Sequence, residues 1–280
     1  MTISAFKLDK HRTLSITHSN AKYQTSSKKY EDQLEQIVKG QLGKNKFITE
    51  FSYIDSKFCF KRNIKACLGY EDEEFTVYAL NNELSAPFQI THPDDIMHKQ
   101  RYDMISYSLV TSDYKFDALN DYVKMSFRIL HKDGHVLNVE RSVYLFRINA
   151  EGIPLSQLSI WEVCNAINPY VTPKYYTKHY KSIMDDFHRL NTTILGIKFT
   201  PTENKILKLK KEYISTTKIQ TILGMNSKRT LEKHIENILK KTKSFAESQH
   251  LKYTISTIYE ALHIAESYGL INYEGKIPTS

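Results

Sequence analysis

The sequence predicts an α+β protein, with an antiparallel sheet and flanking helices followed by a C-terminal region built from helices alone. Apolar and polar residues alternate along "YVKMSFRIL", which is the period of a half-buried strand. Asp133-Gly134 follows as a hairpin turn signal. Beyond residue 198 the apolar residues recur at three- and four-residue spacing, which is typical of amphipathic helices.

The elements are expected in the following order. The polar segment 1–44 contains one predicted helix, near Tyr30 to Val38. Short strands are expected around 47–60, then helices around 64–80 and 94–109. A meander follows, with strands over 123–129, 137–145 and 155–163. Two prolines mark a linker over 167–198, with a short helix at "KSIMDDFHRLN".

The positive charge of the chain is concentrated in one region. The whole chain has a net charge of +8, and residues 198–243 alone contain 12 Lys and Arg against 4 Asp and Glu, also a net of +8. Concentrated positive charge attracts a polyanion, because binding releases counterions. A solvated basic face remains the alternative explanation.

Composition excludes several classes of protein. No apolar run reaches the roughly 18 residues of a membrane helix, and "MTISAFKLDKHRT" lacks the apolar core of a signal peptide. We therefore expect a cytoplasmic protein with no membrane partner. Cys59, Cys67 and Cys164 fit no paired spacing, so reduced thiols are expected. No catalytic triad, phosphate loop or metal-spaced Cys/His set was found, so no enzymatic activity is predicted.

The region from Thr200 carries the start and stop signals of consecutive helices. Thr200 can cap a helix, with Pro201 at its first position and Glu203 completing a capping box. In "STTKIQTILG", Gly224 is placed to end a second helix in a left-handed conformation. Ser227 can cap the helix of "NSKRTLEKHIENILKK". Two helices joined by so short a turn predict a helix-turn-helix.

These residues resemble the LuxR/NarL-type DNA-binding domain. The resemblance covers about 199–272. It rests on Thr200-Pro201 with Glu203, on Leu223-Gly224, on Ser227, Thr230, Leu231, His234, Ile238 and Leu239, and on "IYEALHIAESYGLI" as the closing helix. It implies an all-α domain of four helices over 199–280 that binds double-stranded DNA. The usual glycine after the first helix is replaced near Tyr213-Ile214, and an inserted segment, 244–253, separates the last two helices.

The resemblance also implies which side chains meet DNA. It implies base contacts from Glu232, Lys233 and Glu236, and backbone contacts from Lys228, Arg229, Thr230, His234 and Lys240. We add Asn237 and Lys241, which lie on the same wet side of the helix. His234 has an alternative role as a half-buried, hydrogen-bonded histidine.

The region 45–166 resembles a PAS sensor domain. The resemblance rests on "NIKACLGYEDEEF", on "ITHPDDI" and on the hairpin of "FRILHKDGHVLNVERSVYLF". It implies a small cavity able to hold a small-molecule ligand, or a surface that pairs with a second copy. No cofactor is predicted. His98 lies five residues after Pro93, as the haem ligand does in haem-binding PAS sensors, but an exposed helical histidine is the default expectation.

Together the two resemblances predict a homodimeric transcriptional regulator of bacterial type. In it, a PAS-like sensory or dimerisation domain would control a LuxR-type helix-turn-helix. The alternative is a protein-interaction adaptor whose helical domain has lost DNA binding. Glu232 and Glu236 favour this alternative, because carboxylates repel phosphate.

Overall fold

A computed structural model describes residues 27–53, 57–75, 90–111, 116–117, 120–148, 154–165, 173–249, 251 and 254–271. Predictions for 1–26, 76–80, 167–172 and 272–280 lie outside these residues. The chain forms two compact units. Unit 1 comprises Met1–His92, Lys115–Tyr122 and Arg128–Ala166, and unit 2 comprises Pro93–Tyr114, Val123–Phe127 and Ile167–Ser280. The domain bounds at 44, 166 and 198 remain a prediction.

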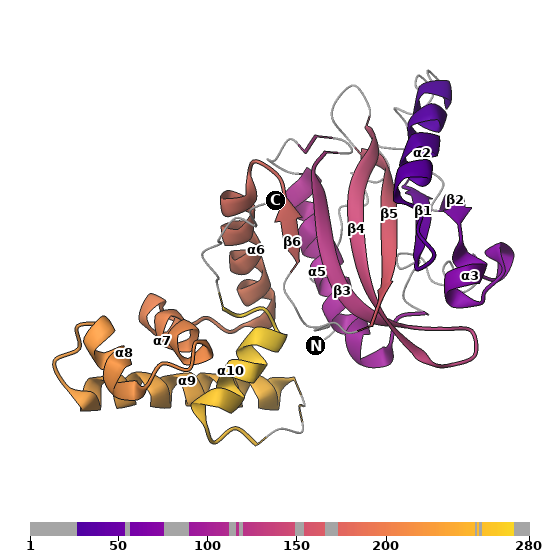
Figure 1. The fold of residues 1–280 in the computed structure, drawn as a ribbon. Coiled ribbons are helices and arrows are strands. Elements are labelled where there is room, and N and C mark those ends of the chain that lie inside the picture. The colour runs from indigo at the N-terminus through magenta and orange to yellow at the C-terminus, as the bar shows by residue number, and fades with distance from the viewer. Residues whose placement is uncertain are drawn as a thin grey trace. The chain divides into compact units, whose positions relative to one another are not determined.

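The predicted α+β class is confirmed by a six-stranded sheet and a helical C-terminal region (Figure 1). The strand order is β2-β1-β5-β4-β3-β6, and the pairs β1–β2, β1–β5 and β4–β5 are antiparallel. The bounds are β1 Lys46–Ser52, β2 Lys57–Arg62, β3 Tyr122–Leu130, β4 Val136–Ile148, β5 Pro154–Cys164 and β6 Lys174–Tyr176. In β3 the buried residues alternate strictly with half-buried ones, as the sequence predicts.

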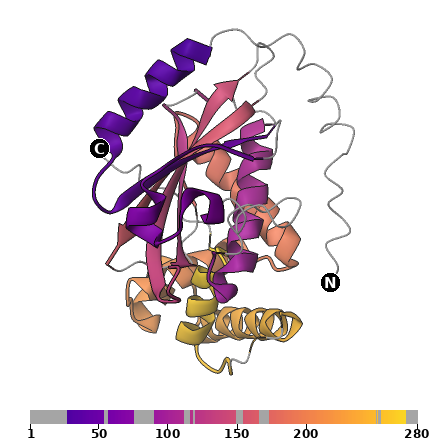
Figure 2. The same ribbon diagram turned by 90° about the vertical axis from the view of Figure 1, so that its right-hand side faces the viewer.

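In unit 1, one face of the sheet packs against helix α2, Ser27–Gln41. This helix is longer than the predicted one. Leu34 is buried with Ile48 of β1, Phe146 of β4, and Leu158 and Ile160 of β5. Figure 2 shows α2 lying across these strands. Because side chains alternate along a strand, the neighbouring residues of β1 and β5 face the other side.

The other face of unit 1 is built around Trp161. Its ring stacks on Phe47 with the centroids 5.1 Å apart, and its Nε1 donates to Thr49 Oγ1 at 3.0 Å. Arg141, which interrupts the apolar alternation of β4, is buried here. Its guanidinium carbon lies 4.9 Å from the Trp161 ring centroid, and its Nε donates to Ser159 Oγ at 3.1 Å.

Helix α3, Ile64–Leu68, is short and is bounded by left-handed residues at both ends. Asn63 precedes it with a φ of 67°, and Gly69 follows it with a φ of 76°. Asn63 Nδ2 donates to the carbonyl of Lys46 at 2.7 Å, which holds the start of α3 against the start of β1. Cys59, Cys67 and Cys164 form no disulfide in this structure.

In unit 2, helices α5, Pro93–Thr111, and α6, Tyr180–Leu195, pack against each other through aromatic side chains. Asp94 and Asp95 lie in the first turn of α5, as the "HPDD" segment predicts. Phe187 of α6 lies 5.4 Å from Tyr102 of α5, measured between ring centroids. Helix α6 extends beyond both ends of the short helix predicted within the linker, "KSIMDDFHRLN".

The C-terminal helices are α7 Pro201–Lys211, α8 Thr216–Ile222, α9 Lys228–Ser248 and α10 Ile258–Ser267. They confirm the predicted four-helix domain. Its buried core contains Ile206 and Leu207 of α7, Ile219 of α8, Leu231 and Ile238 of α9, and Ala261 and Ala265 of α10. Across the part of the chain that the structure describes, no helix combines the length and hydrophobicity needed to cross a membrane.

Candidate nucleic-acid interface

The capping box at Thr200 fixes where the helical domain begins. Thr200 Oγ1 accepts from the backbone N–H of Glu203 at 3.2 Å, and the Glu203 carboxylate accepts from the Thr200 N–H at 2.7 Å. Pro201 occupies the first turn, where no N–H donor is needed. The predicted start is confirmed in full.

Helix α7 ends at a non-glycine residue in the left-handed region. Tyr213 lies where the resembled family usually has a glycine. It has a φ of 57°, and the residue is 85% exposed. The N–H of Ile214 donates to the carbonyl of Leu209 at 3.0 Å, which closes the end of the helix. A tyrosine in this conformation carries a steric cost that glycine avoids.

The turn between α8 and α9 has the geometry predicted from its sequence. Gly224 has a φ of 62°, and the N–H of Met225 donates to the carbonyl of Gln220 at 3.0 Å. Ser227 Oγ then accepts from the N–H of Thr230 at 3.2 Å and caps α9. The short turn fixes the angle between the two helices, so α9 begins at a defined place on the surface of the domain.

Helix α9 continues well beyond the predicted end at Lys241. Residues 244–248, expected to lie in the connection between helices, form its last turns. The expectation was wrong because Phe245 and Ala246 extend the inward stripe of Ile238 and Thr242 and are buried with it. Phe245 also contacts Tyr268, with the ring centroids 5.0 Å apart.

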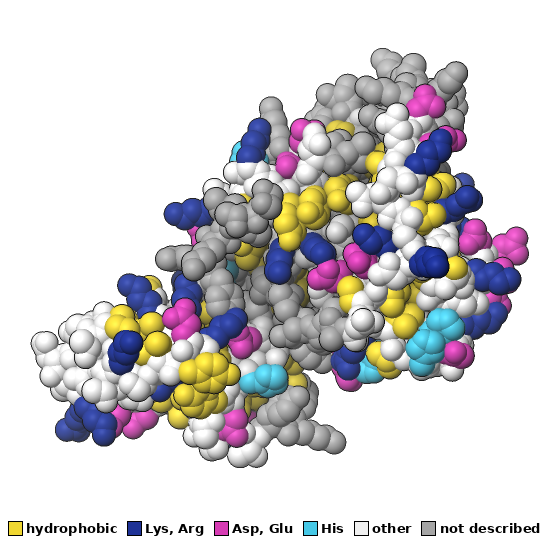
Figure 3. All heavy atoms as spheres, in the orientation of Figure 1, with side chains coloured by type: hydrophobic (Ala, Val, Ile, Leu, Met, Phe, Trp, Pro, Cys, Tyr) yellow, Lys and Arg dark blue, Asp and Glu magenta, His cyan; other side chains and the backbone are white. Residues whose placement is uncertain are grey.

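Most of the predicted DNA-contacting residues are exposed on α9. The inward side of the helix is held by Leu231 and Ile238, both fully buried. The predicted residues that lie exposed are Lys228, Arg229, Thr230, Glu232, Lys233, Glu236, Asn237 and Lys240. Figure 3 shows Lys and Arg side chains distributed over the surface of this helical domain, at the lower left, with acidic side chains among them.

Two of the predicted residues are half-buried, and Lys241 has partners within its own domain. Lys241 Nζ lies 2.6 Å from Glu203 Oε2 and donates to the carbonyl of Lys198 at 3.2 Å. Burial raises the pKa of Glu203, but the hydrogen bonds from Lys241 and from the Thr200 N–H outweigh it, so the net shift is downward. Lys241 thus ties α9 to the start of α7. His234 is half-buried, and its role remains a prediction.

The carboxylate of Glu232 is partly neutralised along the helix. It lies 3.4 Å from Lys228 Nζ in an exposed i,i+4 pair. Such a pair contributes only about 0.3–0.5 kcal/mol, so either side chain can exchange it for another partner. Two further lysines have partners within the domain: Lys210 donates to Thr216 Oγ1 at 3.0 Å, and Lys211 pairs with Glu266 at 2.6 Å.

His98 is buried rather than exposed, so the default expectation for this residue was wrong. Its ring lies 4.5 Å from the ring of Tyr268, centroid to centroid, and Arg101 approaches its Nδ1 at 3.1 Å. Burial, with a smaller contribution from the Arg101 charge, lowers the pKa of His98 to about 3. The neutral ring therefore packs between α5 and the end of α10.

Sequence reasoning missed the residues that join α5 and α6 to the helical domain. Asn191 of α6, fully buried, donates from Nδ2 to the carbonyls of Tyr268 and Gly269 at 2.9 and 3.0 Å. It satisfies the backbone at the end of α10. A signal was present, since Asn191 follows the buried Ile183 and Phe187 at helical spacing and is polar at an inward position.

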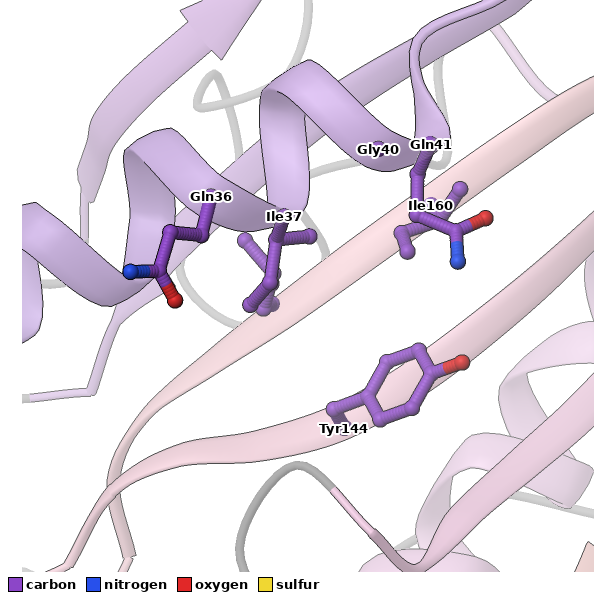
Figure 4. A pocket seen from close by; sticks show the side chains of 7 residues that line it. Gln36, Ile37, Gly40, Gln41, Tyr144 and Ile160 are labelled. Atoms are coloured by element: carbon purple, nitrogen blue, oxygen red, sulfur yellow. The ribbon is translucent and has the colours of Figure 1, made fainter.

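A pocket of about 380 Å³ lies in unit 1, between α2 and the sheet (Figure 4). Its apolar side chains are Ile37, Leu158 and Ile160, and its polar side chains are Gln36, Gln41 and Tyr144. Burial, together with the neighbouring Tyr122, raises the pKa of Tyr144 to about 12. The phenol is therefore a neutral hydrogen-bonding group at physiological pH.

No family model matches the chain, and no curated protein matches it. Among solved structures, the chain is similar to the PAS domain of a Colwellia psychrerythraea protein, with 16% identity and a TM-score of 0.34. That match covers 48% of this chain and 98% of the other. The chain is also similar to the N-terminal domain of a Marinobacter aquaeolei diguanylate cyclase with a PAS/PAC sensor, with 16% identity and a TM-score of 0.31. That match covers 42% of this chain and 94% of the other.

The chain is also similar to VqmA structures over most of its length. The Vibrio cholerae VqmA dimer, described as a LuxR-type receptor, is 13% identical, with 85% of this chain and 88% of that chain covered and a TM-score of 0.32. A phage VqmA–DPO complex is 11% identical, with a TM-score of 0.32. The match covers 89% of this chain and 93% of that chain. At these TM-scores the likeness is too distant to give any residue of this chain a role.

Proposed function

We propose that this protein is a cytoplasmic, homodimeric DNA-binding transcriptional regulator. A PAS-like sensory or dimerisation domain would control a LuxR-type helix-turn-helix. The observation that carries the proposal is the α8–α9 pair: a glycine-containing turn joins two capped helices, and the second buries one side while exposing the other. No catalytic step is part of the proposal.

The exposed side of α9 supports duplex binding through two kinds of side chain. Lys228, Arg229 and Thr230 stand at its N-terminal end, where a recognition helix meets the groove and the phosphates beside it. Lys233 follows one turn further, where base edges are reached, and lysine hydrogen-bonds to guanine acceptors. Because Leu231 and Ile238 hold the helix to its core, these side chains project from a rigid support.

The contacts that α5 and α6 make with the end of α10 support control of the helical domain. His98 of α5 and Asn191 of α6 both contact the segment at Tyr268 that ends α10. A change in the position of α5 would therefore act on the domain that bears α9. We propose that an input shifts the population between two arrangements of these helices, which requires the input to bind the two arrangements with different affinity.

The pocket beneath α2 is the proposed input site. Its apolar floor and its neutral polar groups, two amides and one phenol, fit a small uncharged molecule that can both donate and accept hydrogen bonds. An absorbance spectrum and a native mass of the purified protein would test this part, because a bound molecule adds mass. The same mass gives the oligomeric state.

Duplex binding by the full chain tests the central proposal. We expect gel shifts with mixed genomic fragments at low ionic strength. The logarithm of the association constant should fall linearly with the logarithm of the salt concentration. The charge reversal Lys233→Glu changes one exposed side chain, and it should weaken duplex binding and relax the preference at one base position. A full chain that stays folded but binds no duplex even at low salt would contradict the proposal.

The adaptor alternative retains one specific observation in its favour. Glu232 and Glu236 are both exposed on the side of α9 that would face DNA. A carboxylate there is compatible with DNA only if it accepts from cytosine N4–H₂ or is turned toward a neighbouring lysine. Replacing both residues with glutamine separates the two functions. The regulator predicts changed sequence preference, whereas the adaptor predicts no duplex binding before or after the change.

A further inference from the structure

The hairpin between β3 and β4 holds two histidines and an aspartate that no part of the proposed function uses. The N–H of His131 donates to the carbonyl of His135 at 2.9 Å, so these two residues face each other across the turn. The three intervening residues form a tight loop, in which the N–H of Gly134 donates to the carbonyl of His131 at 2.9 Å. Gly134 has a φ of 92°, the region that such a loop requires.

The side chains of this turn converge on a single oxygen. Asp133 Oδ1 lies 2.8 Å from His131 Nδ1 and 2.5 Å from His135 Nδ1. The two imidazole rings are nearly parallel, with centroids 4.2 Å apart. One ligand atom from each residue lies within 4.8 Å of the others, which makes the three a candidate metal site among the described residues. Figure 3 shows histidine side chains beside an acidic one at this hairpin.

Neighbouring residues hold the turn in place. The N–H of Lys132 donates to the carbonyl of Leu68 at 3.0 Å, and Lys132 Nζ binds both oxygens of Glu74 at 2.7 Å. The lysine charge is thus paired with Glu74. Gly69 provides the space for the His131 ring, since a Cβ at Gly69 would lie 2.8 Å from its Cε1. The donor atoms therefore sit on a braced hairpin.

The contacts of Asp133 favour a cation at the centre of this cluster. Its Oδ1 lies beside Nδ1 of both His131 and His135, and an unprotonated imidazole nitrogen is an acceptor like the carboxylate oxygen. A proton or a metal ion between two such acceptors removes their repulsion. A metal ion on His131 Nδ1 would take the lone pair that accepts the Asp133 N–H at 3.3 Å, so this long hydrogen bond would be given up.

From this geometry we propose that His131, Asp133 and His135 bind one borderline divalent metal ion, with Zn²⁺ as the natural candidate. Two imidazoles and one carboxylate are a ligand set that suits such ions, and water would fill the remaining positions. Ligand atoms around tetrahedral Zn²⁺ lie roughly 3.4 Å apart. The present contacts therefore need to open by less than about 1 Å. Asp133 and His135, with side chains 63% and 54% exposed, are free to make that movement.

Metal titration of the full chain tests this proposal. The protein is stripped with a chelator and titrated with Zn²⁺ by calorimetry, and with Co²⁺ by visible absorption, which reports ligand geometry. We expect the wild-type chain to bind one Zn²⁺ ion, and we expect His135→Gln and Asp133→Asn each to lower the affinity for that ion at least tenfold. We also expect Zn²⁺ to raise the melting temperature of the wild-type chain and not that of the two variants.

The matched control is His263→Gln, which removes an exposed histidine of α10 and should leave binding unchanged. Circular dichroism confirms that each variant is folded, and the wild-type Co²⁺ spectrum supplies a readout that needs no variant. An absence of saturable binding by the wild type would overturn the proposal. So would equal stoichiometry and affinity in the wild type and both hairpin variants.

Discussion

The ring of His98 packs on the ring of Tyr268, with the centroids 4.5 Å apart and the planes inclined by 56°. The first residue belongs to α5, and the second ends α10 of the helical domain. The contact keeps the imidazole away from water, and Arg101 lies beside it. A protonated His98 is therefore disfavoured in the folded protein.

This burial predicts a pH dependence of stability. The pKa of His98 is about 3 in the folded protein, against 6.5 for a histidine side chain exposed to water, as in the unfolded chain. Below pH 6.5 the unfolded chain binds a proton that the folded chain excludes, so the free energy of unfolding falls as pH decreases from 6.5 toward 3. At pH 5 we expect a loss of about 1–2 kcal/mol relative to pH 7.5.

The comparison variant is His98→Phe, which keeps an aromatic ring but cannot titrate. Urea unfolding of both proteins at pH 7.5 and pH 5 isolates the histidine, because all other titrating groups are common to both. An identical pH dependence in the wild type and the variant would show that His98 is not held neutral in the fold.

Lys241→Ala should destabilise the helical domain. The change leaves the carboxylate of Glu203, whose side chain is 2% exposed, without its ammonium partner. Because the Thr200 N–H still donates to that carboxylate, we expect a loss of about 1–2 kcal/mol in the free energy of unfolding. The control is Lys240→Ala at the exposed neighbouring position, where the loss should stay within about 0.5 kcal/mol.

This pair of variants also tests the predicted DNA contact of Lys241. If Lys241 acts only within the fold, its removal lowers the free energy of unfolding. DNA affinity then falls only because less of the protein is folded. If Lys241→Ala weakened duplex binding at unchanged stability, the lysine would act on DNA and its contact with Glu203 would be secondary.

Tyr213→Gly should stabilise the protein. The φ of Tyr213 is 57° and its side chain is largely exposed, so removing the side chain relieves backbone strain and sacrifices little packing. We expect a gain of about 1 kcal/mol. Gly224→Ala provides the reverse case, since its φ is 62° and a Cβ there would meet no atom within 4 Å. That change should cost about 1 kcal/mol from conformation alone. Thermal unfolding of both variants and of the wild type measures the two effects.

Lys233→Ala and Lys240→Ala should weaken DNA binding in different ways. Removing Lys233 should lower affinity for the preferred sequence by about 1–3 kcal/mol and relax one base position. Removing Lys240 should weaken all sequences alike and reduce the salt slope by about 1. Binding titrations on matched and mismatched duplexes at several salt concentrations separate the two. Identical effects would argue against the assigned orientation of α9 in the groove.

The sequence by itself determined the features that depend on nearby residues. The capping box at Thr200, the left-handed Gly224 and the cap at Ser227 are formed by side chains and backbone within a few positions of one another. The alternation of β3 is equally local, because the pleat of a strand has a fixed period. For each of these features, the sequence predicted both the residue involved and the local interaction or backbone conformation that it forms.

Only the tertiary structure decided which side chains meet across long separations in the chain. The partner of Lys241 is Glu203, 38 residues earlier, and the burial of His98 depends on Tyr268. Residues 244–248 continue the helical spacing of the inward side of α9, but the core that Phe245 enters is supplied by the rest of the domain. Burial and pairing depend on what the rest of the fold brings close, so a residue type and its spacing leave them open.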